Sequence, residues 1–241
     1  MMNGKHRFAF FASLEGSAKK DQQLFSIQDE VLRKRIALIL RMKKGDHLTL
    51  FDHEDSADVI LEEVSKKSVQ YRILSTQKIE RSTPEIICLL PLLKREALEQ
   101  AISRLAILGV STIQLVVSEK SRQSLTQKET ARLQKMMVAA AEQSKQFAMP
   151  ELLVSKKLEE SFSELNFEHA FLFDQYGESS RKILTQKYSK PILLAFGPEG
   201  DFTETEKQFF KKNNFKALLL TTSILRTIDA VLLGVGLFRL S

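Results

Sequence analysis

The sequence predicts an α/β protein in which a small β-rich module precedes a larger domain built on a parallel sheet. Before about residue 75, apolar residues alternate with polar ones, as they do in half-buried strands. After about residue 80, short continuous apolar runs are separated by helical patterns, which is typical of parallel strands covered on both faces. We therefore expect two domains, residues 1–78 and residues 79–241.

The N-terminal module combines short strands with one basic, amphipathic helix. Strands are expected at residues 6–12, 46–51, 57–64 and 68–74. The helix is expected over Asp29–Arg41, where apolar residues recur at helical spacing and Arg33, Lys34, Arg35 and Arg41 add positive charge. A polar stretch, Ser75–Pro84, is interpreted as the linker to the second domain.

The larger domain alternates strands and helices. Strands are expected at Ile86–Leu92, Ile113–Val117, His169–Phe173, Ile192–Phe196 and Ala217–Leu220. Helices are expected at Lys94–Leu108, Lys128–Phe147 and about Leu225–Leu240. Gly109 and Pro150 follow the first two helices, where residues of these types commonly end a helix.

Composition narrows the class of protein. Hydrophobic residues make up 43% and charged residues 27%, as in an ordinary globular protein. A net charge of +6 gives a mild indication of a polyanionic partner. The single cysteine, Cys88, lies in an apolar run, and no secretory signal is visible, so we expect a reducing cytoplasmic location. No membrane span and no metal site are expected, because apolar runs are short and the four histidines are scattered.

The connection after the strand Ile192–Phe196 is a candidate ligand loop. In open α/β sheets, ligands bind outside the carboxyl ends of the strands. Gly197 and Gly200 would let the backbone turn sharply and approach a ligand there. Thr203 and Glu206 then form a capping-box pattern at the start of a helix. An ordinary strand–turn–helix connection uses the same residues, so the local pattern leaves both interpretations open.

Two common nucleotide-binding motifs are missing from the sequence. Neither G-x-G-x-x-G after a strand nor the P-loop pattern is present. The triplet Gly234-Val235-Gly236 lies inside an apolar helix, and we expect it to serve close packing.

Arg226 marks a second informative segment. It follows a strand end and a short polar loop, at the opening of the last expected helix. A cation there opposes the helix dipole, and an anionic partner such as a phosphate or carboxylate would relieve that conflict. Pairing with an acid at the edge of the core is an equally open alternative.

Together, the two segments resemble the C-terminal signature of the RsmE-type enzymes of the SPOUT superfamily, which methylate N3 of a uridine in small-subunit ribosomal RNA. That signature reads G-P-E-G-G-F-[ST]-x-x-E and then L-G-x-R-I-L-R-T-E-T-A. The corresponding residues here are Gly197-Pro198-Glu199-Gly200-Asp201-Phe202-Thr203, Glu206, Leu220-Thr221 and Ser223-Ile224-Leu225-Arg226-Thr227. Further matches are Leu108-Gly109-Val110, Ala140-Ala141-Glu142-Gln143-Ser144 with Pro150, His6-Arg7-Phe8 and Lys43-Lys44-Gly45-Asp46.

The resemblance implies a SPOUT trefoil-knot domain preceded by a PUA-like β-barrel that helps to hold RNA. It also implies S-adenosylmethionine as cofactor, 16S rRNA of the small subunit as substrate, and a homodimer. For the chemistry itself, Arg226 is the candidate for stabilising the uracil N3 anion or fixing a nearby phosphate, and Glu199 for orienting the substrate or accepting a proton. The implied cofactor-binding residues are Leu172, Phe196, Gly197, Pro198, Glu199, Gly200, Leu219, Leu220, Ile224, Leu225 and Thr227. The candidate RNA-binding residues are Arg7, Arg33, Lys34, Arg41, Arg104 and Gln143.

Several residues depart from the family pattern. Asp201 and Thr221 replace glycines, Ser223 and Gln146 replace arginines, Ile107 replaces a glutamate, and Ile228-Asp229 replaces Glu-Thr. The cofactor loop is better preserved than the positions expected to contact RNA. A SPOUT-fold RNA-binding module with little or no catalysis, and a methyltransferase for another rRNA position, are therefore the alternative hypotheses.

Overall fold

The computed structural model describes residues 7–14, 23–155, 157–161 and 165–240. The chain forms two compact units. The first comprises residues 1–80 and 142–148, and the second comprises residues 81–141 and 149–241. His6, at the start of the first expected strand, lies outside the described residues.

The first unit contains a five-stranded sheet in the order β1-β3-β4-β5-β2. β1 runs parallel to β3, and the other neighbouring strands are antiparallel. Side chains such as Phe10, Leu48 and Leu61 form a buried core of their own. The strands are β1 (Phe8–Phe11), β2 (Leu24–Ser26), β3 (His47–Phe51), β4 (Asp55–Val64) and β5 (Val69–Lys78).

Two sequence predictions for this unit need correction. Ser75–Pro84 was expected to be a linker, but its first residues continue β5 and pair with Asp55–Asp58 of β4. This end of β5 is exposed, so its residues are polar although they form a strand. The expected helix over Asp29–Arg41 is divided into α1 (Glu30–Lys34) and a π-helical segment, η1 (Arg35–Ile39).

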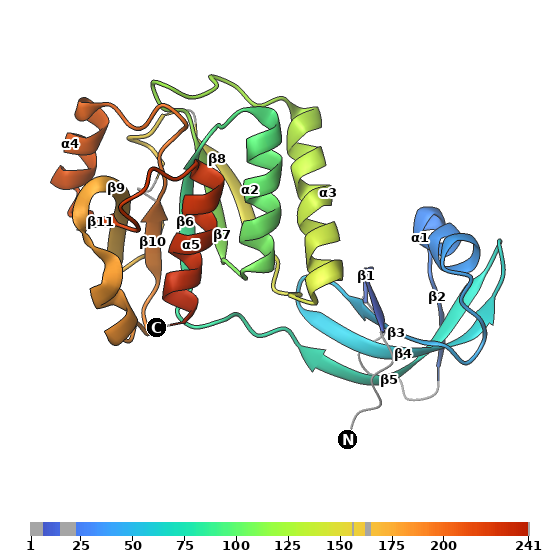
Figure 1. The fold of residues 1–241 in the computed structure, drawn as a ribbon. Coiled ribbons are helices and arrows are strands. Elements are labelled where there is room, and N and C mark those ends of the chain that lie inside the picture. The colour runs from blue at the N-terminus through green and yellow to red at the C-terminus, as the bar shows by residue number, and fades with distance from the viewer. Residues whose placement is uncertain (1–6, 15–22, 156, 162–164, 241) are drawn as a thin grey trace. The chain divides into compact units, whose positions relative to one another are not determined.

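The second unit contains a six-stranded sheet in the order β11-β9-β10-β6-β7-β8 (Figure 1). Every neighbouring pair in it is parallel, which confirms the predicted α/β class with a parallel sheet. The strands are β6 (Ile86–Pro91), β7 (Thr112–Val116), β8 (Glu151–Ser155), β9 (His169–Ser179), β10 (Ile192–Ala195) and β11 (Lys216–Leu219). The helices are α2 (Arg95–Ile107), α3 (Gln127–Ser144), a 3-10 segment η2 (Ser180–Thr185), α4 (Glu204–Lys212) and α5 (Thr227–Arg239).

Buried side chains on both faces of this sheet explain its apolar strands. Along β6, Cys88 and Leu90 face a core shared with α2, α3 and α5, whereas Leu89 faces the core on the other side, to which α4 contributes Phe210. Figure 1 shows α2 and α5 side by side on one face. Complete burial raises the pKa of the Cys88 thiol, so the sulfur stays protonated and unreactive.

Arg239, the last residue of α5, ties that helix to the segment before β6 and to the segment after α2. Its guanidinium donates hydrogen bonds to the carbonyl oxygens of Pro84, Leu108 and Gly109.

Within the described part of the chain, no helix is long and apolar enough to cross a membrane. The same residues contain no group of three or more His, Cys, Asp or Glu side chains placed to hold a metal ion.

Candidate active site

A break in strand pairing forms the first wall of the main pocket. β11 pairs with Phe171 and Leu172 of β9, and then with Glu178 and Ser179. The residues of β9 between these two sets do not pair with β11. Three of them, Phe173, Asp174 and Gln175, line the pocket. Gly177 permits the break, because a Cβ atom there would lie 2.5 Å from the backbone nitrogen of Leu218.

The second wall is the connection between β10 and α4. A turn is closed where the Asp201 amide donates to the Pro198 carbonyl over 3.0 Å. The predicted capping box is present, with Thr203 as N-cap and Glu206 bonding back to it. The left-handed residue of this turn is Asp201, with φ of 58°, and not one of the two glycines. Gly197 is favoured for a different reason, because there is little room for a side chain: a Cβ atom there would lie 3.2 Å from the Asp201 carboxylate.

The third wall is the connection between β11 and α5. The Thr227 hydroxyl donates to the Gly197 carbonyl over 2.9 Å and so joins the second and third walls. Thr221, which stands where the family pattern has glycine, braces its own loop through hydrogen bonds with Ser223. Unlike Asp201, Thr221 does not have a positive φ, so this position does not require glycine for its backbone conformation.

These three walls bring together most of the cofactor-binding residues expected from the sequence. The pocket is lined by Gly197, Pro198, Glu199, Leu219, Leu220, Ile224, Leu225 and Thr227 of that set. Leu172 and Phe196 are instead buried in the two cores beside the sheet, and Gly200 is exposed and adjoins Lys120. The pocket also includes eight residues that were not among the cofactor-binding residues named from the resemblance: Phe173, Asp174, Gln175, Asp201, Leu218, Thr221, Ser223 and Ala230.

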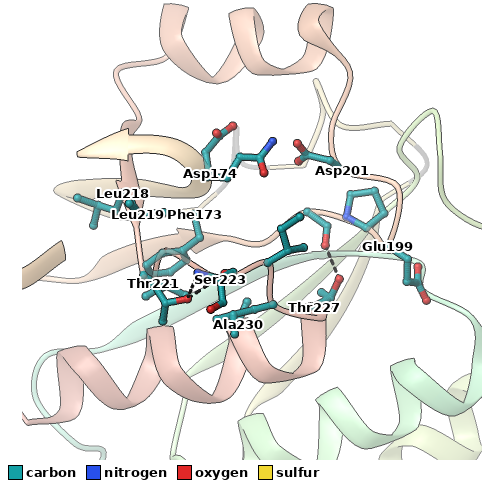
Figure 2. Close-up of a pocket in the computed structure, with 16 residues that line it drawn as sticks. Phe173, Asp174, Glu199, Asp201, Leu218, Leu219, Thr221, Ser223, Thr227 and Ala230 are labelled. Atoms are coloured by element: carbon teal, nitrogen blue, oxygen red, sulfur yellow. Dashed lines mark hydrogen bonds between the residues drawn. The ribbon is translucent and has the colours of Figure 1, made fainter. Parts of the chain in front are cut away.

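Two acidic side chains, Asp174 and Asp201, lie on one side of this pocket, across from Thr221, Ser223 and Ala230 (Figure 2). The Lys207 ammonium lies 2.7 Å from an oxygen of each carboxylate. Burial by itself would lower the pKa of Lys207, but its hydrogen bonds to Asp174 and Asp201 outweigh burial and raise the pKa to about 12. The group is therefore an ammonium ion at neutral pH.

Sequence reasoning missed both Asp174 and Lys207 as site residues. Asp174 directly follows the apolar stretch of β9, so the rule that ligands bind at the carboxyl ends of strands could have indicated it. Lys207 has no such signal, because it is one of several polar residues on α4.

The two expected catalytic residues lie at the rim of the pocket. Glu199 is exposed, and its carboxylate is turned away from the other lining side chains (Figure 2). Arg226 is the exposed N-cap of α5, between the lining residues Leu225 and Thr227, but does not itself line the pocket. Across the described residues, its guanidinium has no hydrogen bond or ion pair, so the alternative of a paired core-edge arginine is not what the structure shows.

The candidate RNA-binding residues differ in how free they are. Arg7 pairs with Asp58, Lys34 pairs with Glu30, and Arg33 donates to two backbone carbonyls, so these three cations are already engaged. Arg41 and Gln143 are exposed, and Arg104 makes one long hydrogen bond of 3.5 Å to Gln100. Five of the six belong to the first unit, and Arg104 belongs to the second.

Comparison with known proteins assigns the family. Residues 80–239 match the family described as RNA methyltransferase domain. The chain belongs to this family. Its curated relatives confirm the RsmE resemblance inferred from the sequence: ribosomal RNA small subunit methyltransferase E 2 of Borreliella burgdorferi is 24% identical over 88% of this chain and 90% of its own length. The corresponding Aquifex aeolicus protein, ribosomal RNA small subunit methyltransferase E, is 28% identical over 52% of this chain and 54% of its own length.

Solved structures share the fold of this RNA methyltransferase. A ribosomal RNA small subunit methyltransferase E from Neisseria gonorrhoeae, crystallised with S-adenosylmethionine, superposes with a TM-score of 0.83, 24% identity and 97% coverage of both chains. A Legionella pneumophila protein described as a methyltransferase, also solved with that cofactor, gives a TM-score of 0.83 at 23% identity and 98% coverage of both chains.

Proposed function

We propose that this chain is an S-adenosylmethionine-dependent methyltransferase that forms 3-methyluridine in 16S rRNA of the small ribosomal subunit. Membership of the RNA methyltransferase domain family carries this proposal, together with relatives named small subunit methyltransferase E. Such an enzyme works where ribosomes are assembled, which is the cytoplasm of a bacterial cell.

The pocket described above suits the proposed cofactor. Its apolar wall, which includes Leu218, Leu219 and Leu225, offers a surface for an adenine ring. Its acidic side, Asp174 and Asp201, offers negative charge to a cationic ligand. When bound, S-adenosylmethionine supplies an activated methyl group on a sulfonium ion.

Alignment and charge are what the protein's own residues contribute to methyl transfer. The three walls hold a ligand in one orientation, and orientation lowers the barrier of a displacement reaction. Uracil N3 carries a proton at neutral pH, so the reaction also needs its anion to be stabilised. We propose that Arg226, whose guanidinium has no partner among the described residues, stabilises that anion or fixes a nearby phosphate. Glu199 is proposed to orient the substrate or accept the proton.

The domain assignment is proposed on the same resemblance. Residues 1–78 would be the PUA-like β-barrel RNA-binding domain, and residues 79–241 the SPOUT methyltransferase domain. The separate buried core of the first unit supports an independent N-terminal domain. In the second, we propose that the return from the edge strand β11 to α5, fixed by the Thr227–Gly197 hydrogen bond, forms the trefoil knot. The salt dependence of small-subunit binding tests the first assignment, because phosphate contacts weaken as salt rises.

Nucleoside analysis of ribosomal RNA tests the function. We expect a strain lacking this gene to lose 3-methyluridine from its 16S rRNA, and the purified protein with S-adenosylmethionine to restore the nucleoside on small subunits from that strain. Persistence of 3-methyluridine would reject the target and leave a methyltransferase for another position. Calorimetry that detects neither the cofactor nor its demethylated product would instead favour an RNA-binding module without catalysis.

Replacement of Arg226 tests its proposed role within that assay. Arg226→Ala should lower the methylation rate on small subunits by about 10²–10³-fold, the usual effect of removing one group that stabilises a developing anion. Its affinity for S-adenosylmethionine should stay close to that of the wild type, because Arg226 does not line the pocket. Arg181→Ala, at another exposed arginine of the same unit, is the matched control. Full activity of Arg226→Ala would rule out the role.

A further inference from the structure

Lys207 joins two of the three walls of the pocket. Its ammonium lies 2.7 Å from Oδ2 of Asp174 and 2.7 Å from Oδ2 of Asp201. These partners come from β9 and from the β10–α4 connection, and Lys207 itself comes from α4. We call this group the Lys207 bridge. Two of its members are largely shielded from water, since the side chains of Lys207 and Asp174 are 15% and 7% exposed, whereas that of Asp201 is 45% exposed.

Asp201 is held in an unusual conformation by this bridge. Its φ of 58° lies in the left-handed region, which most residues other than glycine avoid. Its carboxylate offsets that cost by accepting hydrogen bonds from the Phe202 amide, over 2.8 Å, and from Lys207. A glycine, the residue of the family pattern, would adopt the same backbone without either bond. This chain therefore has a charged cross-link at a turn that would otherwise be held by backbone alone.

Asp174 plays the matching part in the first wall. Its Oδ1 accepts a hydrogen bond from the Tyr176 amide over 2.7 Å, at the place where β9 leaves its ladder with β11. Its Oδ2 accepts from Lys207. One carboxylate thus fixes the shape of its own loop and ties that loop to α4.

The charges of the bridge favour an ordered arrangement. Two carboxylates this close to one another would repel if the ammonium were removed, and the repulsion is strong where water is scarce. With Lys207 in place the group carries a net charge of −1, and each carboxylate oxygen already has a donor. Asp174 and Asp201 line the pocket, whereas Lys207 lies behind them and does not.

We propose that Lys207 is a positioning residue that sets the separation of Asp174 and Asp201, and through them the width of the pocket that binds the methyl donor. This inference rests on the proposed function, because it assigns a role within the cofactor site. It predicts that Lys207 controls ligand affinity through geometry, while the methyl-transfer step itself depends on other residues.

Calorimetry with four proteins tests the proposal. Lys207→Met should weaken binding of both S-adenosylmethionine and its demethylated product by about tenfold, because both need the same pocket width. Lys207→Arg, which retains charge and two-partner hydrogen bonding, should return both affinities to within about threefold of the wild type. Lys211→Met, the same substitution at an exposed lysine of α4, should change neither affinity.

Steady-state kinetics separate positioning from a purely structural role. Lys207→Met should raise the KM for S-adenosylmethionine about tenfold while kcat at saturating donor stays within about twofold of the wild type. A residue that only stabilised the fold would lower the unfolding midpoint and leave both KM and Kd unchanged at temperatures well below it. That result would overturn the proposal, and so would a gain in affinity for the cationic donor alone, which would show that Lys207 acts only through charge.

Hydrogen exchange in the ligand-free protein keeps this test independent of the proposed function. The amides of Tyr176 and Phe202 donate to the two bridge carboxylates, so they should exchange about tenfold faster in Lys207→Met than in Lys211→Met. If the wild type bound neither ligand, the proposed function would fail, while faster exchange would still establish the bridge as a constraint on the pocket. Unchanged exchange at both amides would overturn the positioning role.

Discussion

Gly234 of α5 packs directly against two aromatic rings of the sheet. A Cβ atom at this position would lie 2.8 Å from ring atoms of both Phe173 and Phe196, which is closer than carbon atoms approach in folded proteins. The two rings are stacked with centroids 4.8 Å apart, and Phe173 also lines the pocket. The expectation of close packing at the Gly234-Val235-Gly236 triplet is therefore met at Gly234. It is not met at Gly236, where a Cβ would meet nothing within 4 Å.

The two glycines form a matched pair for a stability measurement. Gly234→Ala should lower the free energy of unfolding by about 1–3 kcal/mol, because the added methyl group forces the rings or the helix to move. Gly236→Ala should raise it by up to about 1 kcal/mol, because alanine favours a helix and open space is available. Urea unfolding of both variants measures the difference. Equal stabilities would show that α5 can shift without cost.

At the scale of single elements, α3 begins with a capping box that depends on one carboxylate. Glu129 accepts hydrogen bonds from the Thr126 amide and hydroxyl and from Arg122, while its own amide donates to the Thr126 hydroxyl. The hydrogen bonds from Thr126 and Arg122 lower the pKa of Glu129 from its ordinary value of 4.5 to about 2. The ionised form is thus favoured in the folded protein.

Glu129 should consequently make the fold sensitive to acid in a defined window. Because its pKa is lower in the folded chain, the carboxylate stabilises the protein above about pH 4.5, and this contribution is lost as the pH falls toward 2. Glu129→Gln should be less stable than the wild type at pH 7 and lose less stability between pH 5 and pH 3. Urea midpoints across this range measure the effect. Glu96→Gln, in the first turn of α2, is the control and should follow the wild type.

At the scale of the whole molecule, several large apolar side chains of the second unit are exposed. Ile224 is 89% exposed at the pocket rim, and Leu232 and Leu233 of α5 are 46% and 42% exposed. Leaving several large apolar side chains of neighbouring segments in water is unfavourable. We propose that a second copy of this chain covers them, which makes the homodimer expected from the sequence.

Light scattering or sedimentation measures the expected dimer. The wild type should have twice the mass of one chain, and Leu232→Asp combined with Leu233→Asp should shift it to the monomer mass without unfolding it. Val31→Asp is the control, because Val31 is 76% exposed on α1 of the other unit. A wild-type protein that is monomeric at micromolar concentration would contradict the proposal.

Burial explains which parts of the fold could be predicted from the sequence. Every residue of β6 is buried, so it has to be apolar, and such a strand is visible as a continuous run. The exposed end of β5 has no side chains to bury, so it does not have the composition of a core strand. β8 is an edge strand whose apolar run has only three residues, Leu152–Val154, which is too short to stand out in the sequence. The three residues of β2 are too few to show a pattern.

The residues of the candidate site also fall into two groups, those that could be predicted from the sequence and those that could not. Gly197, Pro198 and Thr203 were found because a turn and a helix start restrict the residue types that can occupy them. Asp174 and Lys207 were missed because their partners are distant in sequence and meet only in the folded chain. Asp201, which stands where the family pattern has glycine, therefore appears from the sequence only as a mismatch to that pattern. In the structure, both oxygens of its carboxylate accept hydrogen bonds.

Because three connections of the chain form the pocket, a ligand bound there would affect how long the protein survives in a cell. A ligand seated there would contact lining residues of all three connections, such as Asp174, Pro198 and Leu219, and so hold these connections together while it is bound. Ligand that binds only the folded chain raises the free energy of unfolding, by about 2.7 kcal/mol at a hundred times its Kd. Proteases that cleave unfolded segments would then find fewer such segments when ligand is plentiful. Abundance of the enzyme would in this way follow the supply of its own methyl donor.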